Sequence, residues 1–109
     1  MRFPQEGGFY ELNPFPGCAG IVVSNHSWID PVLRGNKLGT KNHWRRLQHI
    51  ANLGYSYALC TVNDDNIAQK KILIHNGWYQ FTKFVNKETG HTVCLYGRHI
   101  DNDLLVSQP

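Results

Sequence analysis

The chain has 109 residues, a length that fits one domain and leaves no room for two. Hydrophobic residues make up 41% and charged residues 17%, which excludes a disordered chain because enough apolar side chains are present to form a core. Eleven Lys and Arg against eight Asp and Glu give a net charge of +3. The basic residues are scattered, so this excess favours a small anionic ligand over nucleic acid.

Three cysteines, Cys18, Cys60 and Cys94, lie far apart and form neither an even disulfide framework nor a zinc pattern. The sequence therefore predicts no metal site. The first residues lack the apolar stretch of a signal peptide, and no run of 18 apolar residues could cross a membrane. We therefore expect a cytoplasmic protein with no membrane partner.

Residues 1–17 are rich in Gly and Pro and predict a short N-terminal arm with at most one edge strand, at 9–12. Residues 18–29 read as a strand that ends before Pro31. A turn-rich loop over 30–40 leads into a helix that ends near Leu53, before Gly54. In this helix the apolar residues follow the helical period, and Arg45, Arg46, Gln48, His49 and Asn52 are expected to form a polar outer face.

The second half of the chain continues with a strand over 55–62 and a helix over 67–75, with N-cap residues supplied by Asn63-Asp64-Asp65-Asn66. Residues 78–85 and 92–97 form a hairpin, and residues 101–109 are expected to fray. This order predicts one α/β domain over residues 1–109, with its core at 18–100. We expect a mixed central β-sheet with helices on both faces, in which the strands at 18–29 and 55–62 are parallel.

The loop before the first helix carries the residues of an anion-binding site. Backbone N–H groups at the start of a helix have no intrahelical partner and attract anions. Gly35 and Gly39 let the backbone approach a ligand, while Arg34 and Lys37 add positive charge. A plain glycine-containing turn would show the same residues, so both interpretations stay open. The spacing matches neither a P-loop nor a dinucleotide fingerprint.

The segment Ile29-Asp30-Pro31, followed by Arg34-Gly35-Asn36-Lys37-Leu38-Gly39-Thr40, resembles the cofactor loop of the GNAT superfamily of acyl-CoA-dependent N-acyltransferases. That loop reads Arg/Gln-x-x-Gly-x-Gly/Ala, and Lys37 stands at its first glycine. Asn66, with Gly77-Trp78 eleven and twelve positions later, is similar to a second pattern of the family, with Trp in place of Phe. The resemblance covers residues 20–99.

This resemblance implies a GNAT-like fold, splayed at its cofactor cleft, that transfers an acetyl group from acetyl-CoA to a primary amine of a small molecule or protein. The backbone near Ile29 would polarise the thioester carbonyl, the loop from Arg34 to Thr40 would hold the pyrophosphate, and Asn66 would contact the pantetheine arm. The cofactor-binding residues that it implies are Ile29, Arg34, Gly35, Asn36, Lys37, Leu38, Gly39, Thr40 and Asn66.

The catalytic groups depart from the family pattern. Many members carry a Tyr seven positions after the Asn, where it protonates the leaving thiolate, but this chain has Leu73. His75 and Tyr79 are nearby candidates for that proton donor. His26, on the strand that leads to the loop, is the candidate base, because an ordinary imidazole pKa suits proton transfer near neutrality. A purely structural role for His26 stays open.

Most of the segment that walls the acceptor pocket in the family has no counterpart before residue 18. We therefore expect an open acceptor site or one that a second chain completes, and a homodimer formed through the edge strand or the C-terminal hairpin. A catalytically inactive GNAT-like module, kept for CoA binding or protein interaction, is the alternative function.

Overall fold

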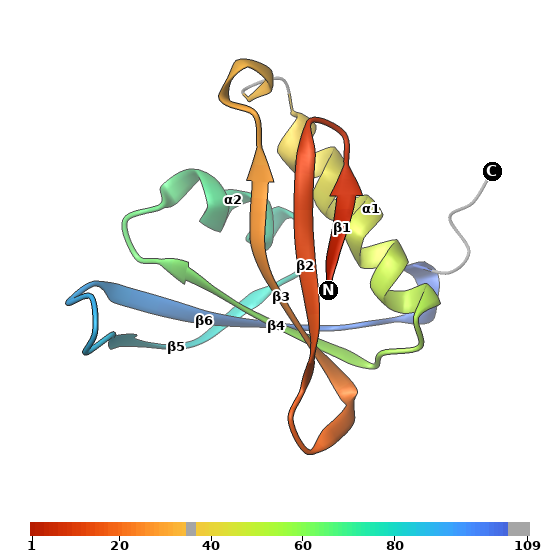
Figure 1. Cartoon of the computed structure of the whole chain (residues 1–109). Helices are drawn as coiled ribbons and strands as arrows, with labels where there is room; N and C mark the ends of the chain where they lie inside the picture. Colours follow the sequence, from red (N-terminus) through yellow and green to blue (C-terminus); the bar gives the residue numbers. More distant parts are fainter. Residues whose placement is uncertain (35–36, 105–109) are drawn as a thin grey trace.

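One six-stranded sheet and two α-helices make up the fold (Figure 1). The computed structural model describes residues 1–34 and 37–104, with the backbone alone at His26 and Asp103. The strand order is β1-β2-β3-β4-β6-β5, and β3 and β4 are the parallel pair. The elements are β1 Arg2–Gln5, β2 Gly8–Phe15, β3 Cys18–Ile29, η1 Pro31–Leu33, α1 Leu38–Asn52, β4 Tyr57–Asn63, α2 Ile67–His75, β5 Tyr79–Val85, β6 Thr92–His99 and η2 Asn102–Leu104. The predicted mixed α/β sheet is confirmed.

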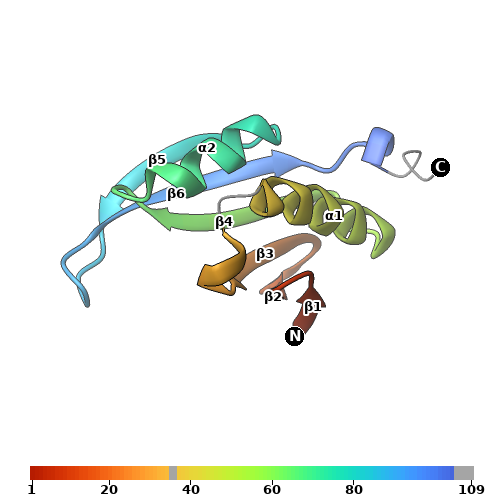
Figure 2. The same cartoon turned by 90° about the horizontal axis from the view of Figure 1, so that it is seen from above.

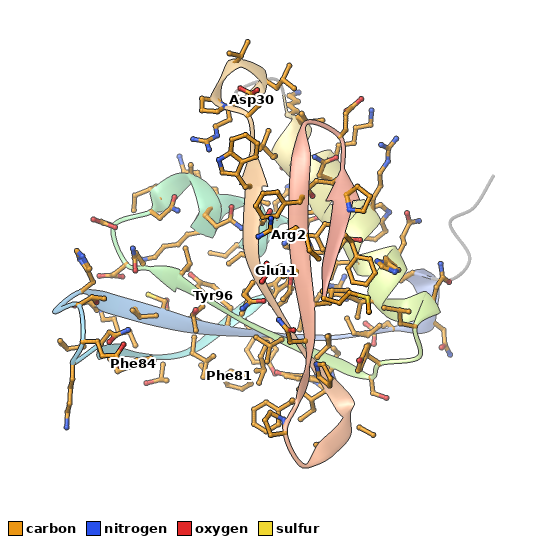
Figure 3. All side chains as sticks on the ribbon, in the orientation of Figure 1. Arg2, Glu11, Asp30, Phe81, Phe84 and Tyr96 are labelled. Atoms are coloured by element: carbon orange, nitrogen blue, oxygen red, sulfur yellow. The ribbon has the colours of Figure 1, made fainter. Side chains whose placement is uncertain are left out.

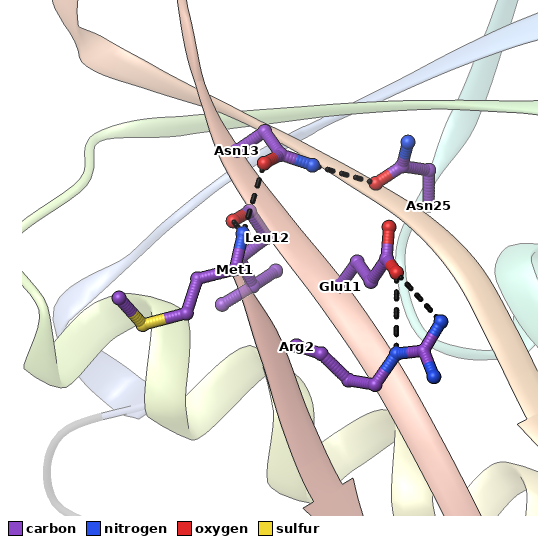
Figure 4. Close-up of polar contacts among 6 residues, drawn as sticks. All are labelled: Met1, Arg2, Glu11, Leu12, Asn13 and Asn25. Atoms are coloured by element: carbon purple, nitrogen blue, oxygen red, sulfur yellow. Dashed lines mark hydrogen bonds and ion pairs between the residues drawn. The ribbon is translucent and has the colours of Figure 1, made fainter.

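The N-terminal arm differs from the expected single edge strand, because β1 and β2 form a hairpin. Gly7, with a positive φ of 78°, makes the tight connection. The N-terminal ammonium donates to the carbonyl oxygen of Leu12 at 2.9 Å, and Arg2 forms an ion pair with Glu11 at 3.1 Å (Figure 4). These cross-strand contacts order a segment whose Gly and Pro content suggested at most one edge strand.

Both helices lie on the same face of the sheet, whereas the sequence analysis placed helices on both faces (Figures 1 and 2). The two helices touch, and a Cβ added to Gly39 of α1 would lie 2.9 Å from Cδ1 of Ile72 in α2. The physical reason is topological. The crossovers β3–α1–β4 and β4–α2–β5 advance in the same direction along the sheet, and crossovers of one hand then place their helices on one face.

The parallel strands β3 and β4 separate soon after they pair. Their register covers only residues 21–23 of β3 against 57–59 of β4. A β-bulge between Asn25 and Trp28 then bends β3, because three steps along β3 match two along β2. Beyond the pairing, β3 runs on to Ile29 and β4 to Asn63 without contact in the ladder. The expected splay between these strands is confirmed.

The C-terminal segment is ordered further than the sequence suggested. Residues 102–104 form the short helix η2, which contacts α1. Leu104 is 1% exposed and belongs to the hydrophobic core, where a frayed tail was expected. Residues 105–109 lie outside the described part of the chain.

Helix α1 buries polar side chains together with its apolar stripe. Leu47 and Ile50 are fully buried, as their helical spacing predicts, but Asn42, His43 and Arg46 are buried as well. The indole Nε1 of Trp78 donates to Nε2 of His43 at 2.6 Å, which holds the proton of the neutral imidazole on Nδ1. Burial lowers the pKa of His43 well below its ordinary value, and the charges of Arg46 and Arg98 act in the same direction.

We therefore expect His43 to make the protein less stable in mild acid. Its pKa is lower in the folded chain than the ordinary 6.5, so the unfolded chain binds more protons in the interval between the two values. The stabilisation is complete above pH 6.5 and is lost as the pH falls below it, at up to about 1.4 kcal/mol for each pH unit. Urea unfolding between about pH 5 and 7 measures this slope.

His43→Gln keeps an acceptor for Trp78 and cannot titrate, so the variant should lose most of the slope. A smaller slope of the same sign should remain from His49, whose pKa burial also lowers. An unchanged slope in the variant would show that His43 is not the titrating group.

Candidate functional site

Two cavities occupy the gap between β3 and β4. The helix-side cavity, of about 580 Å³, lies between the N-terminal ends of α1 and α2. The strand-side cavity, of about 470 Å³, is walled by β3, β4, the start of α2 and the β5–β6 hairpin. Residues from both faces of the sheet line the strand-side cavity, so it passes through the gap. Four residues line both cavities: Ser27, Arg46, Asn66 and Gln69.

The helix-side cavity is electropositive. Its described lining holds four cationic side chains and no acidic one; the four are Arg34, Lys37, Arg46 and Lys71. The guanidinium of Arg34 donates through Nε to the carbonyl oxygen of Ile29 at 2.8 Å, which fixes it beside the end of β3. A cavity with this charge attracts an anionic ligand.

The start of α1 opens onto the same cavity. The first intrahelical hydrogen bond runs from the N–H of Lys41 to the carbonyl of Lys37, so the N–H groups of residues 38–40 have no helical partner. No side chain caps this end and no acidic residue lies in the first turn. Gly39 and Thr40 line the cavity, and the positive end of the helix dipole therefore adds to its charge.

Lys37 occupies the left-handed region of backbone space, with φ at 62°. The GNAT-like pattern has its first glycine at this position, and a non-glycine residue held in this conformation costs about 1–2 kcal/mol. The chain therefore keeps the backbone geometry of a glycine and gains a cation at the cavity. Gly39 lines the cavity and has a packing role besides the expected one, because the space of its missing side chain faces Ile72 and allows α1 and α2 to meet.

Asn66 joins helix capping to the site. Its Oδ1 accepts a hydrogen bond from the backbone N–H of Gln69 at 3.2 Å, as the sequence predicted for the cap of α2. The same residue lines both cavities. The cap therefore fixes Asn66 at the boundary between the two cavities.

Arg46 lies at the same boundary and is 5% exposed. It donates to Oγ of Ser27 at 2.6 Å and lies near Oγ of Ser24 at 3.4 Å, and its guanidinium stacks on the ring of Tyr10. Burial lowers its pKa to about 10, so the side chain stays charged at neutral pH. Cys60 also lines the strand-side cavity, and burial raises the pKa of its thiol, which therefore stays protonated.

In the structure, most of the predicted cofactor residues line the helix-side cavity. Those that line the helix-side cavity are Ile29, Arg34, Lys37, Gly39, Thr40 and Asn66. Leu38 does not line it, and Gly35 and Asn36 lie outside the described residues.

The catalytic candidates are placed less favourably. His26 lies in the bulged part of β3, and its side chain is outside the described residues. The hydroxyl of Tyr79 pairs with that of Tyr57 at the far end of β4, and His75 is the exposed last residue of α2. Neither Tyr79 nor His75 lines the helix-side or the strand-side cavity.

Sequence analysis missed the shared residues Ser27, Arg46 and Gln69, and also Lys71. Arg46 was assigned to the polar outer face of the helix, and that assignment is wrong. The available signal was its spacing, because position 46 lies four residues after Asn42 and four before Ile50, on the stripe that the structure buries.

Within the described residues, no group of three or more His, Cys, Asp and Glu side chains is placed to hold a metal ion. None of the helices there is long and apolar enough to cross a membrane.

The sequence matches no protein-family model and no curated protein. Solved structures do match the fold. The structure of yncA from Salmonella typhimurium with its cofactor acetyl-CoA aligns with a TM-score of 0.77 at 16% identity, over 87% of this chain and 58% of that one. A GNAT-family acetyltransferase from Streptococcus pneumoniae gives 0.73 at 17% identity, over 87% and 60%.

The ribosomal-protein-S18-alanine N-acetyltransferase from Escherichia coli gives a TM-score of 0.73 at 12% identity, over 87% of this chain and 62% of that one. The chain therefore spans 58–62% of the length of these three proteins. Identities this low establish architecture only. The chain has the fold of the GNAT acetyltransferases, which is the fold that its cofactor-loop pattern implied.

Proposed function

We propose that the protein binds acetyl-CoA in the helix-side cavity and transfers its acetyl group to a primary amine that enters through the strand-side cavity. The observation that carries this proposal is the meeting of an electropositive cavity at a helix N-terminus with a second cavity, through a gap in the sheet. The GNAT fold and the acetyl-CoA held by yncA support the choice of ligand.

The residues of the helix-side cavity fit the phosphates of this ligand. Arg34, Lys37 and Lys71 would bind them as cations, and the free N–H groups at the start of α1 would add hydrogen bonds. Bound acetyl-CoA would supply an acetyl group activated as a thioester. The task of the chain's own residues is then to orient this group at the boundary with the second cavity and to manage protons.

Acetyl transfer requires one proton to leave the amine and one to reach the departing sulfur. Leu73 stands where many family members have Tyr, and it lines the strand-side cavity at 1% exposure without a transferable proton. We propose His26 as the base, supported by its position in the bulge between the two residues Ser24 and Ser27 that line the cavity.

Acetyl-CoA should raise the melting temperature. At about 100 times its dissociation constant a ligand stabilises a fold by about 2.7 kcal/mol, which for this size corresponds to a shift on the order of 10 °C. Lys37→Gly is the sharpest variant, because it removes a cation and suits the left-handed backbone. Its own stability should be kept while the shift shrinks, and Arg34→Ala should weaken the shift as well.

Lys87→Ala, in the turn between β5 and β6, is the matched control and should keep the full shift. No shift in the wild type at millimolar acetyl-CoA would refute the proposal. Binding without release of free CoA across a panel of polyamines, amino acids and lysine peptides would favour the inactive CoA-binding module.

The role of His26 is tested by separating turnover from binding. In His26→Ala, the rate of CoA release should fall while the thermal shift with acetyl-CoA persists, because a base acts on the amine and not on the phosphates. His91→Ala, in the turn before β6, is the control and should keep the wild-type rate. Equal turnover in His26→Ala and wild type would remove His26 from the catalytic groups.

We further propose a homodimer that forms through β5. This edge strand carries exposed apolar side chains, with Phe81 51% and Val85 60% exposed, and Phe81 and Phe84 extend from the side of the sheet away from α2 (Figure 3). An uncovered apolar edge strand favours pairing with a second copy.

Sedimentation at tens of micromolar should therefore give twice the mass of the chain, and Phe81→Glu should give a monomer, since a charge on β5 opposes burial. Val32→Glu, in η1, introduces the same charge elsewhere and should leave the dimer intact. A monomeric wild type would contradict the proposal.

A cytoplasmic location is proposed on the basis of the thiols. Cys60 and Cys94 are buried and free, and Cys18 is free and exposed. Free cysteines of this kind suit a reducing compartment.

A further inference from the structure

Arg46 is a buried cation without a counter-ion. No carboxylate in the described part of the chain contacts it, and its partners are two serine hydroxyls and an aromatic ring. Its Nε has no hydrogen-bond partner. A buried charge that lacks an opposite charge reduces the stability of a fold, so such a residue needs a reason outside packing.

The position of Arg46 supplies that reason. It lines both cavities, together with Ser27, at the level where β3 and β4 separate. In the helix-side cavity Arg34 and Lys37 lie at the loop that precedes α1, whereas Arg46 lies two turns further along the same helix. Arg34 and Lys37 therefore lie where the phosphates of acetyl-CoA are proposed to bind, whereas Arg46 lies nearer the cavity proposed for the acceptor.

The strand-side cavity is polar and has no negative charge in its described lining. Ser24, Asn25, Thr61, Asn63 and Asn86 contribute hydroxyl and amide groups, and Arg46 is the cation. A polyamine or a lysine side chain would bring positive charge to a wall that offers no carboxylate. A ligand with a carboxylate would instead give Arg46 the partner that it lacks.

We propose that Arg46 binds the carboxylate of the acceptor, so that the acceptor is an amino acid or another small amine that carries a carboxylate. The role of this molecule as acceptor rests on the proposed acetyl transfer; the carboxylate site itself does not. Arg46 is the cation in the described lining of the strand-side cavity, where the acceptor is proposed to enter, and this favours the acceptor as the source of the carboxylate over a carboxylated acyl group on the donor.

The test compares amino acids with their amides, which differ only in the carboxylate. We measure melting temperature with a panel of L-amino acids and the matched L-amino-acid amides, with and without CoA. In the wild type at least one amino acid should raise the melting temperature and its amide should not. Arg46→Gln should abolish this response, while Arg45→Gln, at the exposed neighbouring position of α1, should keep it.

Turnover gives a second readout. For the amino acid that binds, kcat/KM relative to its amide should fall about tenfold or more in Arg46→Gln, the effect of losing a charged hydrogen bond. The thermal shift with acetyl-CoA should persist in this variant, because Arg34 and Lys37 remain. Amides that bind as well as amino acids, or amino acids that bind Arg46→Gln as well as wild type, would overturn the proposal.

A comparison of two acyl donors distinguishes the two sources of a carboxylate. If Arg46→Gln changes the preference for succinyl-CoA over acetyl-CoA and leaves the discrimination between amino acids and amides intact, the carboxylate belongs to the acyl group and the acceptor assignment is wrong. A protein that binds amino acids through Arg46 but does not respond to acetyl-CoA would instead refute the acetyl-transfer proposal and leave this carboxylate site standing.

Arg46→Met is a second variant that keeps the proposal testable if Arg46→Gln does not fold. Methionine fills similar volume without charge, and replacing an uncompensated buried ion by an apolar side chain is often neutral or stabilising. We expect Arg46→Met to melt at or above the wild-type temperature without ligand and to show no response to any amino acid. A retained response in Arg46→Met would overturn the role of Arg46.

Discussion

The early separation of β3 and β4 determines the rest of the site. These strands pair over three residues, and the bulge between Asn25 and Trp28 then directs β3 away from its neighbour. A parallel pair that stayed in register to Ile29 would close the sheet and leave no space for either cavity. Because both helices lie on one face, the gap also connects a helix-covered side of the sheet with an uncovered one, which suits the proposed entry of two ligands from opposite sides.

The helix that spans this gap combines packing with polarity. Leu47 and Ile50 hold α1 against the sheet, while His43 and Arg46 on the same stripe carry polar atoms without partners. A helix selected for stability alone would place apolar residues at such positions. Part of this cost falls at the cavity walls, since His43 and Arg46 line the helix-side cavity, whereas Asn42, whose Oδ1 also has no partner, lines neither cavity. Lost stability near a binding site is the pattern expected where function and packing compete.

Sequence reasoning succeeded where a local signal specifies the structure. Asn66 caps α2, and the cofactor-loop pattern identified the positive start of α1, because capping and loop geometry depend on a few neighbouring residues. It failed where distant segments decide. The β1–β2 hairpin depends on contacts such as Arg2 with Glu11, and the burial of Arg46 depends on β3, to which no neighbour of Arg46 in the sequence belongs. The packing role of Gly39 was also missed, since its neighbour Ile72 is 33 positions away along the chain.

Leu73 links the resemblance to the chemistry of the site. It stands seven positions after Asn66, where the family pattern has a proton-donating Tyr, and its side chain lines the strand-side cavity without such a group. Tyr79 pairs with Tyr57 and His75 ends α2, so neither candidate proton donor lines the two cavities, and both assignments stay predictions. The described groups that line both cavities are the hydroxyl of Ser27, the amides of Asn66 and Gln69 and the guanidinium of Arg46. In the strand-side cavity the Cys60 thiol keeps its proton, because burial raises its pKa. In the proposed transfer, solvent in the strand-side cavity would supply the proton for sulfur, and the charges of Arg34, Lys37 and Arg46 suit the protein to binding and orientation.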